Sequence, residues 1–104
     1  MQKLTPQEFC SCYAACTAPK TLLDVRTPQE LQNDGAIPGA VNIPVQVLAE
    51  QLGSLNTDHE IFIFCKAGGR AEVAYQILSG AGFRTTAIAV NGGYVQIAPQ
   101  LQEA

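Results

Sequence analysis

A thiol, two cations and two glycines follow four large apolar side chains in the segment IFIFCKAGGRAEVAYQIL, residues 61–78. The loop that carries them consists of Cys65, Lys66, Ala67, Gly68, Gly69 and Arg70. Glycines let a backbone turn sharply with its amides facing inward, which makes a nest for an anion. Residues 61–71 contain two cations and no acid, and such surroundings favour the thiolate over the thiol. The loop therefore predicts a nucleophilic Cys65 and a site for an anionic substrate.

The alternative for Cys65 is a small buried core residue, because cysteine often has that role. The elements on either side of the loop favour the nucleophile. Residues 61–64 are apolar at every position, as in a strand buried on both faces of a parallel sheet. Residues 71–78 carry an apolar stripe at helical spacing, so a helix should point its partly positive N-terminus at the loop. Ligands of open parallel sheets bind at this carboxyl edge.

The rest of the chain alternates strands with helices. Further helices are expected over residues 6–17, 28–32, 45–52 and 94–101, and further strands over residues 22–25, 40–43 and 86–90. Thr27 is the expected N-cap of the second helix, with Pro28 at the first helical position. This alternation predicts an α/β fold with a short, mainly parallel central sheet and helices on both of its faces.

Length and composition restrict the class of protein. The 104 residues are expected to form one domain, residues 1–104, large enough to bury a core without disulfides. No apolar run approaches the ~20 residues of a membrane span, and the first residues lack an apolar stretch of signal-peptide length. We therefore expect a cytoplasmic protein with reduced cysteines and no membrane partner. The net charge of −3 argues against nucleic-acid binding.

Three more cysteines, Cys10, Cys12 and Cys16, lie in the stretch CSCYAAC. Cys12 and Cys16 share one helix face. A structural zinc site needs four ligands, usually as pairs from two separate segments, and the chain has no second pair. We predict no metal site and no cofactor, and we expect this helix to face the core. A resolving role for one of the three thiols toward Cys65 is left open.

Asp24 and Arg26 end a strand at the same sheet edge as Cys65. We interpret them as part of a structural ion pair, with Glu30 as the candidate partner of Arg26, and we keep open a role in shaping the rim of the site. His59 precedes the strand that ends at Cys65, so the two should lie roughly 20 Å apart. His59 is therefore expected to be a solvated loop residue.

In combination, these segments resemble the single-domain rhodanese-like sulfurtransferases of the thiosulfate sulfurtransferase type. The segments LLDVRTPQEL, GAIPGAVNIP, IFIFCKAGGRAEVAYQIL and VNGGY stand in that family's order and spacing, and the resemblance covers about residues 4–97. It implies that Cys65 takes sulfur from a small anionic donor such as thiosulfate, becomes a persulfide, and passes the sulfur to cyanide, a thiol or a sulfur-acceptor protein. It also implies that the backbone amides of residues 66–70 hold the persulfide or the anionic end of the donor.

Two positions depart from the family's pattern. Ala36 stands where the family usually has His, and Ile97 stands where it often has Trp after the final glycine pair. Neither position is the nucleophile. We expect local packing changes and altered docking of a partner, with the chemistry retained.

The sequence leaves three alternatives to a free-standing thiosulfate enzyme. Rhodanese-fold phosphatases and arsenate reductases also resemble this chain, but their loops place five residues between Cys and Arg, whereas four separate Cys65 from Arg70. The tighter loop favours sulfur transfer. A non-catalytic regulatory or protein-interaction module is less favoured because inactive relatives usually lack the cysteine. A dedicated sulfur carrier to a protein differs only in its acceptor, and the sequence does not separate the two.

Overall fold

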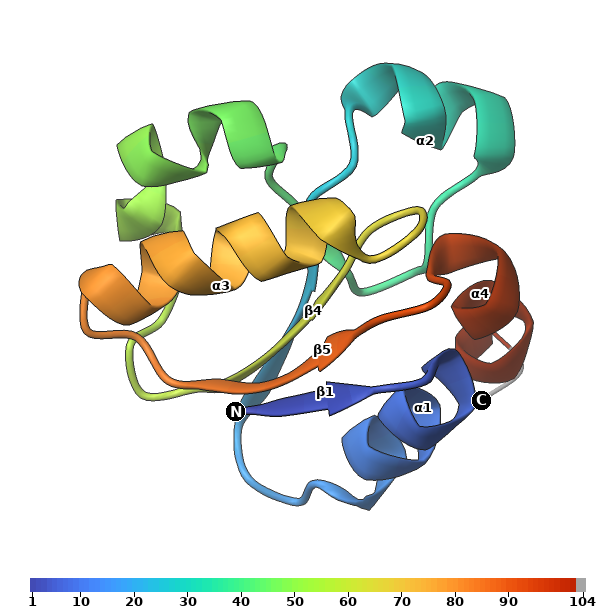
Figure 1. Ribbon diagram of the computed structural model, residues 1–104, viewed down its shortest axis with the longest axis horizontal. Coiled ribbons are helices and arrows are strands. Elements are labelled where there is room, and N and C mark those ends of the chain that lie inside the picture. The colour runs from blue at the N-terminus through green and yellow to red at the C-terminus, as the bar shows by residue number, and fades with distance from the viewer. Residues whose placement is uncertain (103–104) are drawn as a thin grey trace.

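Five strands form a central sheet in the order β1-β5-β4-β2-β3, and the computed structural model describes residues 1–102 (Figure 1). The strands are β1 (Gln2–Leu4), β2 (Lys20–Asp24), β3 (Val41–Asn42), β4 (Glu60–Phe64) and β5 (Thr85–Ala89). The four neighbouring pairs are all parallel, so the carboxyl ends of the strands meet at one edge. The predicted α/β fold with a parallel sheet is confirmed.

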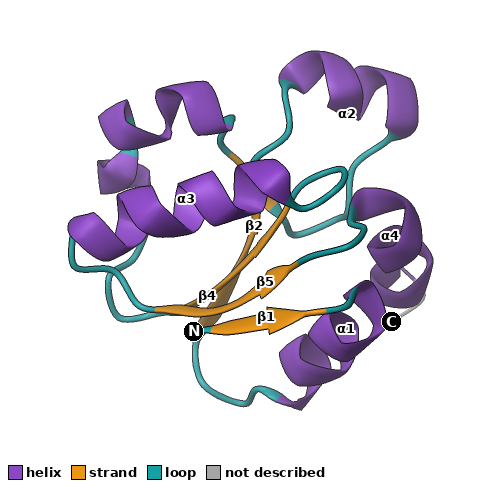
Figure 2. Cartoon of the chain, viewed as in Figure 1, coloured by secondary structure: helices purple, strands orange, loops and turns teal. Residues whose placement is uncertain are grey.

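Helices cover both faces of this sheet, as Figures 1 and 2 show. They are α1 (Pro6–Ala15), α2 (Pro28–Asp34), α3 (Gly69–Gly80) and α4 (Tyr94–Gln102), together with the 3-10 helices η1 (Val45–Glu50) and η2 (Leu52–Ser54). Helix α3 and the 3-10 helices pack on one face, and α1 and α4 pack on the other. Helix α2 lies at the carboxyl edge, beside the loop between β4 and α3. No helix among the described residues is both long and apolar enough to cross a membrane.

Strand β4 is buried on both faces, as its unbroken apolar sequence predicts. The four residues Ile61, Phe62, Ile63 and Phe64 are all 0% exposed. The two isoleucines pack in the core beneath α3, and the two phenylalanines pack against Phe9 of α1. The Phe9 ring meets Phe62 edge-on at 5.9 Å between centroids and Phe64 at 6.5 Å. This double burial fixes the position of the residue that follows, Cys65.

Helix α2 begins with a capping box. The Thr27 hydroxyl accepts the Glu30 amide, and Glu30 Oε1 accepts the Thr27 amide at 3.0 Å. The predicted N-cap role of Thr27 is confirmed, and Thr5 with Glu8 forms the same box at the start of α1. Such a cap satisfies backbone N–H groups that the first helical turn leaves unpaired.

Besides shifts of one or two residues at element ends, the sequence-based expectation differs from the structure at α1, at residues 45–52 and at β1. Helix α1 ends at Ala15 because Cys16 is extended, and the Lys20 ammonium donates to the carbonyls of Tyr13 and Cys16. Residues 45–52, expected to be one helix, form part of two 3-10 helices separated at Gln51. Strand β1 was not predicted.

Candidate functional site

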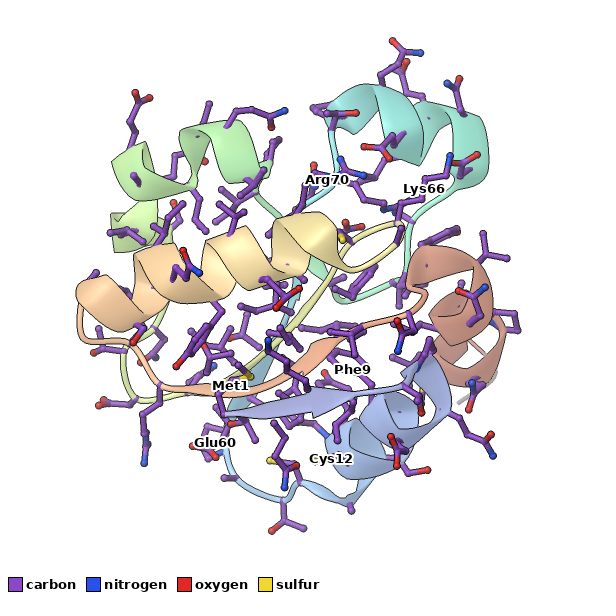
Figure 3. The ribbon with its side chains drawn as sticks, in the orientation of Figure 1. Met1, Phe9, Cys12, Glu60, Lys66 and Arg70 are labelled. Atoms are coloured by element: carbon purple, nitrogen blue, oxygen red, sulfur yellow. The ribbon has the colours of Figure 1, made fainter. Side chains whose placement is uncertain are left out.

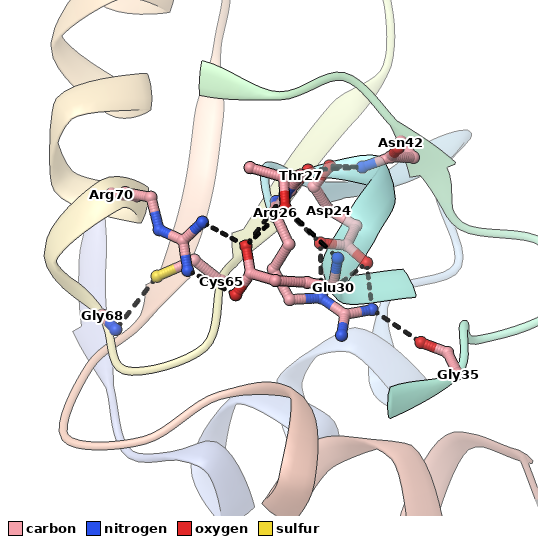
Figure 4. Close-up of polar contacts among 9 residues, drawn as sticks. All are labelled: Asp24, Arg26, Thr27, Glu30, Gly35, Asn42, Cys65, Gly68 and Arg70. Carbon is pink, nitrogen blue, oxygen red and sulfur yellow. Dashed lines mark hydrogen bonds and ion pairs between the residues drawn. The ribbon is translucent and has the colours of Figure 1, made fainter. Parts of the chain in front are cut away.

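Cys65 lies directly after β4, at the carboxyl edge of the sheet. The residue is 1% exposed, and its Sγ accepts a hydrogen bond from the Gly68 amide at 3.0 Å (Figure 4). Gly68 is the N-cap of α3 and has φ +112°, a left-handed conformation that glycine adopts at little cost. The predicted placement of Cys65 between a buried strand and a helix N-terminus is confirmed, whereas its chemical role stays a prediction.

The rest of the loop lies at the surface. Lys66, Ala67 and Gly69 are exposed, while Gly68 is buried under them. Gly69 and Arg70 open α3, and N–H groups in the first turn of a helix have no acceptor within the helix. These groups and the helix dipole favour an anion at this end. The arrangement can hold a negative charge next to Sγ, and substrate binding by residues 66–70 stays a prediction.

The connection between β5 and α4 supports the loop from below. The Cys65 carbonyl accepts the Tyr94 amide at 2.9 Å, and a Cβ on Gly93 would lie 1.9 Å from the same carbonyl oxygen. A Cβ on Gly68 would meet Val90 Cα at 3.1 Å. The two backbones therefore touch at two points, and each contact has a glycine on one side. These contacts are a physical reason for the segment VNGGY to accompany the cysteine loop.

The Arg70 side chain binds Glu30 of α2 through two parallel hydrogen bonds. Nη1 donates to Oε1 at 2.5 Å and Nη2 donates to Oε2 at 2.9 Å (Figure 4). The hydrogen bond from Arg70, with further help from Thr27, lowers the pKa of Glu30 to about 2. Glu30 in turn raises the pKa of Arg70, with smaller contributions from Cys65 and Asp24. Residues 61–71 contain no acid of their own, but Arg70 in this segment binds a carboxylate that α2 supplies.

Sequence reasoning missed this pair because its members stand 40 residues apart. The available signal was the placement of Asp24 and Cys65 at one sheet edge, since β2 and β4 are neighbours and Asp24 pairs in register with Phe64. The first turn of the helix after β2 then has to lie near the first turn of the helix after β4.

Asp24 and Arg26 form a buried ion pair beneath the loop, with side chains 1% and 0% exposed. The Arg26 amide, Nε and Nη2 all donate to the Asp24 carboxylate, and Nη2 also donates to the Gly35 carbonyl at 3.0 Å. The guanidinium lies 3.8 Å from the centre of the Tyr94 ring. The interpretation as a structural ion pair is confirmed, but Glu30 was the wrong partner, because Arg26 turns back to Asp24.

The other three cysteines lie away from the loop, on α1 and at its end. Cys10 is buried in the core beside Phe9, and this burial raises the pKa of its thiol. Cys12 and Cys16 are half-buried and pack against the same core. All four cysteines are free thiols. Within residues 1–102, no three His, Cys, Asp or Glu side chains form a group that could hold a metal ion.

His59 lies in the turn before β4, at the opposite end of that strand from Cys65. It is half-buried, and its Nδ1 lies 2.9 Å from the Thr21 hydroxyl. The expected position at the far end of β4 is confirmed, although the ring is hydrogen-bonded to Thr21 of β2 and only partly solvated.

A hollow of about 320 Å³ lies between the end of α1, strand β2 and the turn after Ile37. Its lining residues include Tyr13, Lys20 and Leu101, and no residue of the cysteine loop takes part. The Lys20 ammonium there already donates to two carbonyls at the end of α1. This hollow therefore lies apart from the candidate site at Cys65.

The two departures from the family's pattern occupy different surroundings. Ile97 is fully buried in α4 against the core that contains Phe9, while Ala36 is exposed directly after Gly35. Ile97 is a core residue, and the expected packing changes and the effect of Ala36 on a docking partner stay predictions.

Comparison with known proteins assigns the chain to a family. Residues 11–100 match the family model for the rhodanese-like domain. The chain belongs to the rhodanese-like family. This rhodanese-like chain resembles SSP1007 from Staphylococcus saprophyticus, with a TM-score of 0.76, 34% identity and 93% of each chain covered. A rhodanese-like domain protein from Staphylococcus aureus has a TM-score of 0.76 and 29% identity, over 93% of this chain and 91% of that one.

A curated relative is named for its activity. A protein of Allochromatium vinosum named "Sulfurtransferase" is 31% identical over 62 residues, which cover 60% of this chain and 57% of the relative. The chain spans between 20% and 61% of the length of four curated relatives that it matches.

Proposed function

We propose that this rhodanese-like chain, acting as a single domain, is a sulfurtransferase that works through a persulfide on Cys65. Its donor is a small anion with a sulfane sulfur, such as thiosulfate, and its acceptor is cyanide, a thiol or a sulfur-acceptor protein. One observation carries the proposal: the Cys65 sulfur accepts the Gly68 amide at the N-terminus of α3. The Allochromatium relative's name supports sulfur transfer as the kind of reaction.

In the loading step, the Cys65 thiolate attacks the outer sulfur of thiosulfate. The new Sγ–S bond forms as the S–S bond of the donor breaks, and sulfite leaves with the bonding electron pair. The Gly68 amide and the first turn of α3 offer positive partial charge to the thiolate and then to the persulfide anion. Because Cys65 is 1% exposed, a donor has to approach it with its narrow terminal sulfur first.

In the unloading step, the acceptor attacks the outer sulfur of the persulfide, and the Cys65 thiolate leaves. With cyanide the product is thiocyanate, and the enzyme returns to its starting state. Neither step abstracts a proton, so no general base is needed. The absence of a catalytic role for His59, which lies at the other end of β4, is consistent with this chemistry.

The length of the loop supports sulfur transfer over phosphate chemistry. The four residues between Cys65 and Arg70 include the N-cap of α3 and its first helical residue, so the loop around the sulfur is short, and the Gly68 amide already donates to Sγ. A tetrahedral phosphate needs a wider cradle. We further propose a cytoplasmic location, where a reducing environment keeps the thiol of Cys65 free between turnovers.

The test is to measure sulfite release from thiosulfate with cyanide as acceptor, together with the intact mass after incubation with thiosulfate alone. We expect a gain of one sulfur atom that cyanide or a reducing thiol removes. Cys65→Ser should abolish both signals, while Cys12→Ser and Cys16→Ser should keep them, as should Cys10→Ser if it folds. Full activity in Cys65→Ser, or sulfur mapped to another cysteine, would overturn the proposal, as would faster hydrolysis of a phosphate ester.

A further inference from the structure

The side chains around Cys65 carry less positive charge than the loop sequence indicates. The two cations of the loop are Lys66 and Arg70. The Arg70 guanidinium, however, donates both of its hydrogen bonds to the Glu30 carboxylate. Asp24 and Arg26 compensate one another beneath the loop. In the part of the chain that the structure describes, no carboxylate lies within ion-pair distance of Lys66, which is exposed.

Glu30 is held in this position by more than Arg70. Its Oε1 also accepts the Thr27 amide at 3.0 Å and the Thr27 hydroxyl at 3.1 Å, so the capping box fixes the carboxylate. The lowered pKa of Glu30, about 2, keeps the group ionised throughout the neutral range. Arg70, which binds Glu30, ends the six-residue loop that Cys65 begins, and Cys65 contributes to raising the pKa of Arg70. A fixed negative charge therefore belongs to the rim of the site.

We propose that Glu30 determines specificity by donor charge, and that it disfavours dianionic donors relative to donors with a single negative charge. The inference rests on the function proposed above. A fixed charge acts twice as strongly on a dianion as on a monoanion at the same distance, because Coulomb energy is proportional to the product of the charges. Glu30 cancels the Arg70 charge that would otherwise attract the second negative charge of thiosulfate.

Two donors isolate this effect. Methanethiosulfonate differs from thiosulfate by a methyl group in place of one oxyanion, so it carries one negative charge instead of two. In both donors the Cys65 thiolate attacks the terminal sulfur and forms the same persulfide. Sulfite leaves from thiosulfate and methanesulfinate leaves from methanethiosulfonate, each with the bonding electron pair. The ratio of kcat/KM for thiosulfate to kcat/KM for methanethiosulfonate then reports on charge.

The decisive variant is Glu30→Gln, because glutamine at this position can still complete a capping box. We expect the thiosulfate-to-methanethiosulfonate ratio to rise roughly five- to tenfold at about 0.1 M ionic strength. Higher ionic strength should reduce the rise, because the site is partly open to solvent. A purely structural role for Glu30 would change both donors alike and leave the ratio where it was.

The matched control is Glu60→Gln. Glu60 also pairs with an arginine, Arg84, at 3.5 Å, but it opens β4 at the end away from Lys66 and Arg70 (Figure 3). The strand places it roughly 16 Å from Cys65, beyond the Debye length at physiological salt. This variant changes the net charge of the chain by the same amount, and we expect its ratio to match the wild type.

The outcomes separate the two proposals. If neither donor loads Cys65 in the wild type, the proposed function fails. If both donors load it and Glu30→Gln shows the same ratio as Glu60→Gln, the role of Glu30 fails alone. If Glu30→Gln does not fold, the two donors are compared in Arg70→Gln with and without Glu30→Gln. In that background the loss of Glu30 leaves no arginine without its partner. There, adding Glu30→Gln must still raise the ratio, and an unchanged ratio overturns the inference.

Discussion

Among single residues, Asp24 and Arg26 impose the strongest constraint on the site. Their ion pair is buried, and Arg26 also reaches the Gly35 carbonyl and the Tyr94 ring. The Asn42 side chain donates to the carbonyls of both Asp24 and Arg26. One buried arginine therefore joins the ends of β2, α2 and β3 to the start of α4, and Tyr94 in turn holds the Cys65 carbonyl.

Asp24→Asn should destabilise the fold strongly. The substitution keeps the size of the side chain but leaves the Arg26 charge buried without a counter-charge, and breaking a buried pair in this way costs about 3–5 kcal/mol. Urea unfolding at neutral pH measures the difference. Arg84→Gln is the control, because its pair with Glu60 lies at the surface and such pairs contribute about 0–1 kcal/mol. Equal effects of the two variants would contradict this account.

Gly93→Ala should displace the cysteine loop. The new Cβ would lie 1.9 Å from the Cys65 carbonyl oxygen, so either that oxygen or the β5–α4 connection has to move. We expect the rate of persulfide formation on Cys65 to fall at least tenfold, as an order of magnitude for a misplaced catalytic group. Intact-mass measurements over time give this rate.

The control for Gly93→Ala is Gly80→Ala. Gly80 is the last residue of α3, and a Cβ there would meet nothing within 4 Å. Alanine is the better helix former, so this variant should be as stable as the wild type or slightly more stable. Loss of loading in both variants would show that the effect of Gly93 is not local.

At the level of elements, α2 and α3 are joined through Glu30 and Arg70, and this contact depends on pH. The pKa of Glu30 in the folded chain, about 2, is lower than the value near 4.3 expected of an unfolded chain. A lowered carboxyl pKa gives stability that is fully present above the unfolded value and is lost as pH falls toward the folded value. The contact therefore weakens between about pH 5 and pH 2.

The difference in unfolding free energy between the wild type and Glu30→Gln should follow this window. We expect a difference on the order of 2 kcal/mol at pH 6, because Glu30 is mostly shielded from water and Arg70 binds it through two hydrogen bonds. The difference should shrink as pH falls from 5 to 2, where Glu30 becomes neutral like glutamine. Urea unfolding at several pH values provides the measurement, and a difference independent of pH would contradict the pairing.

The elements that were predicted well depend on local pattern. The apolar run of β4, the glycine loop and the stripe of α3 are contiguous in sequence, so residue types alone placed Cys65 between them. The Glu30–Arg70 contact was missed because it depends on the order of strands β2 and β4. Strand β1 was missed because three residues, two of them polar, show no clear alternation. Its strand conformation comes from pairing with β5.

At the scale of the whole molecule, strand order links the edge of the sheet to the site. Strand β1 forms one edge, β5 lies beside it, and β4 with Cys65 comes next. The Val90 amide, directly after β5, donates to the Leu4 carbonyl at 2.8 Å. Val90 Cα is also the atom nearest to a Cβ built on Gly68. The edge strand thus holds the segment on which the cysteine loop packs.

Deleting Gln2–Leu4 should therefore weaken both the fold and the site. The deletion removes a three-residue strand and its hydrogen bonds to β5, each worth about 0.5–1.5 kcal/mol net, so the unfolding free energy should fall by roughly 2–4 kcal/mol. Thr5 and Glu8 remain to cap α1. Because the Val90 amide loses its acceptor, the connection beneath Cys65 becomes less constrained, and thiosulfate should load the thiol more slowly even where the chain is fully folded.

Lys3→Gln is the control, since it removes only the exposed pair with Glu72, which contributes little. A deletion that lowers stability but leaves the loading rate unchanged would show that the edge strand supports the sheet without positioning the cysteine.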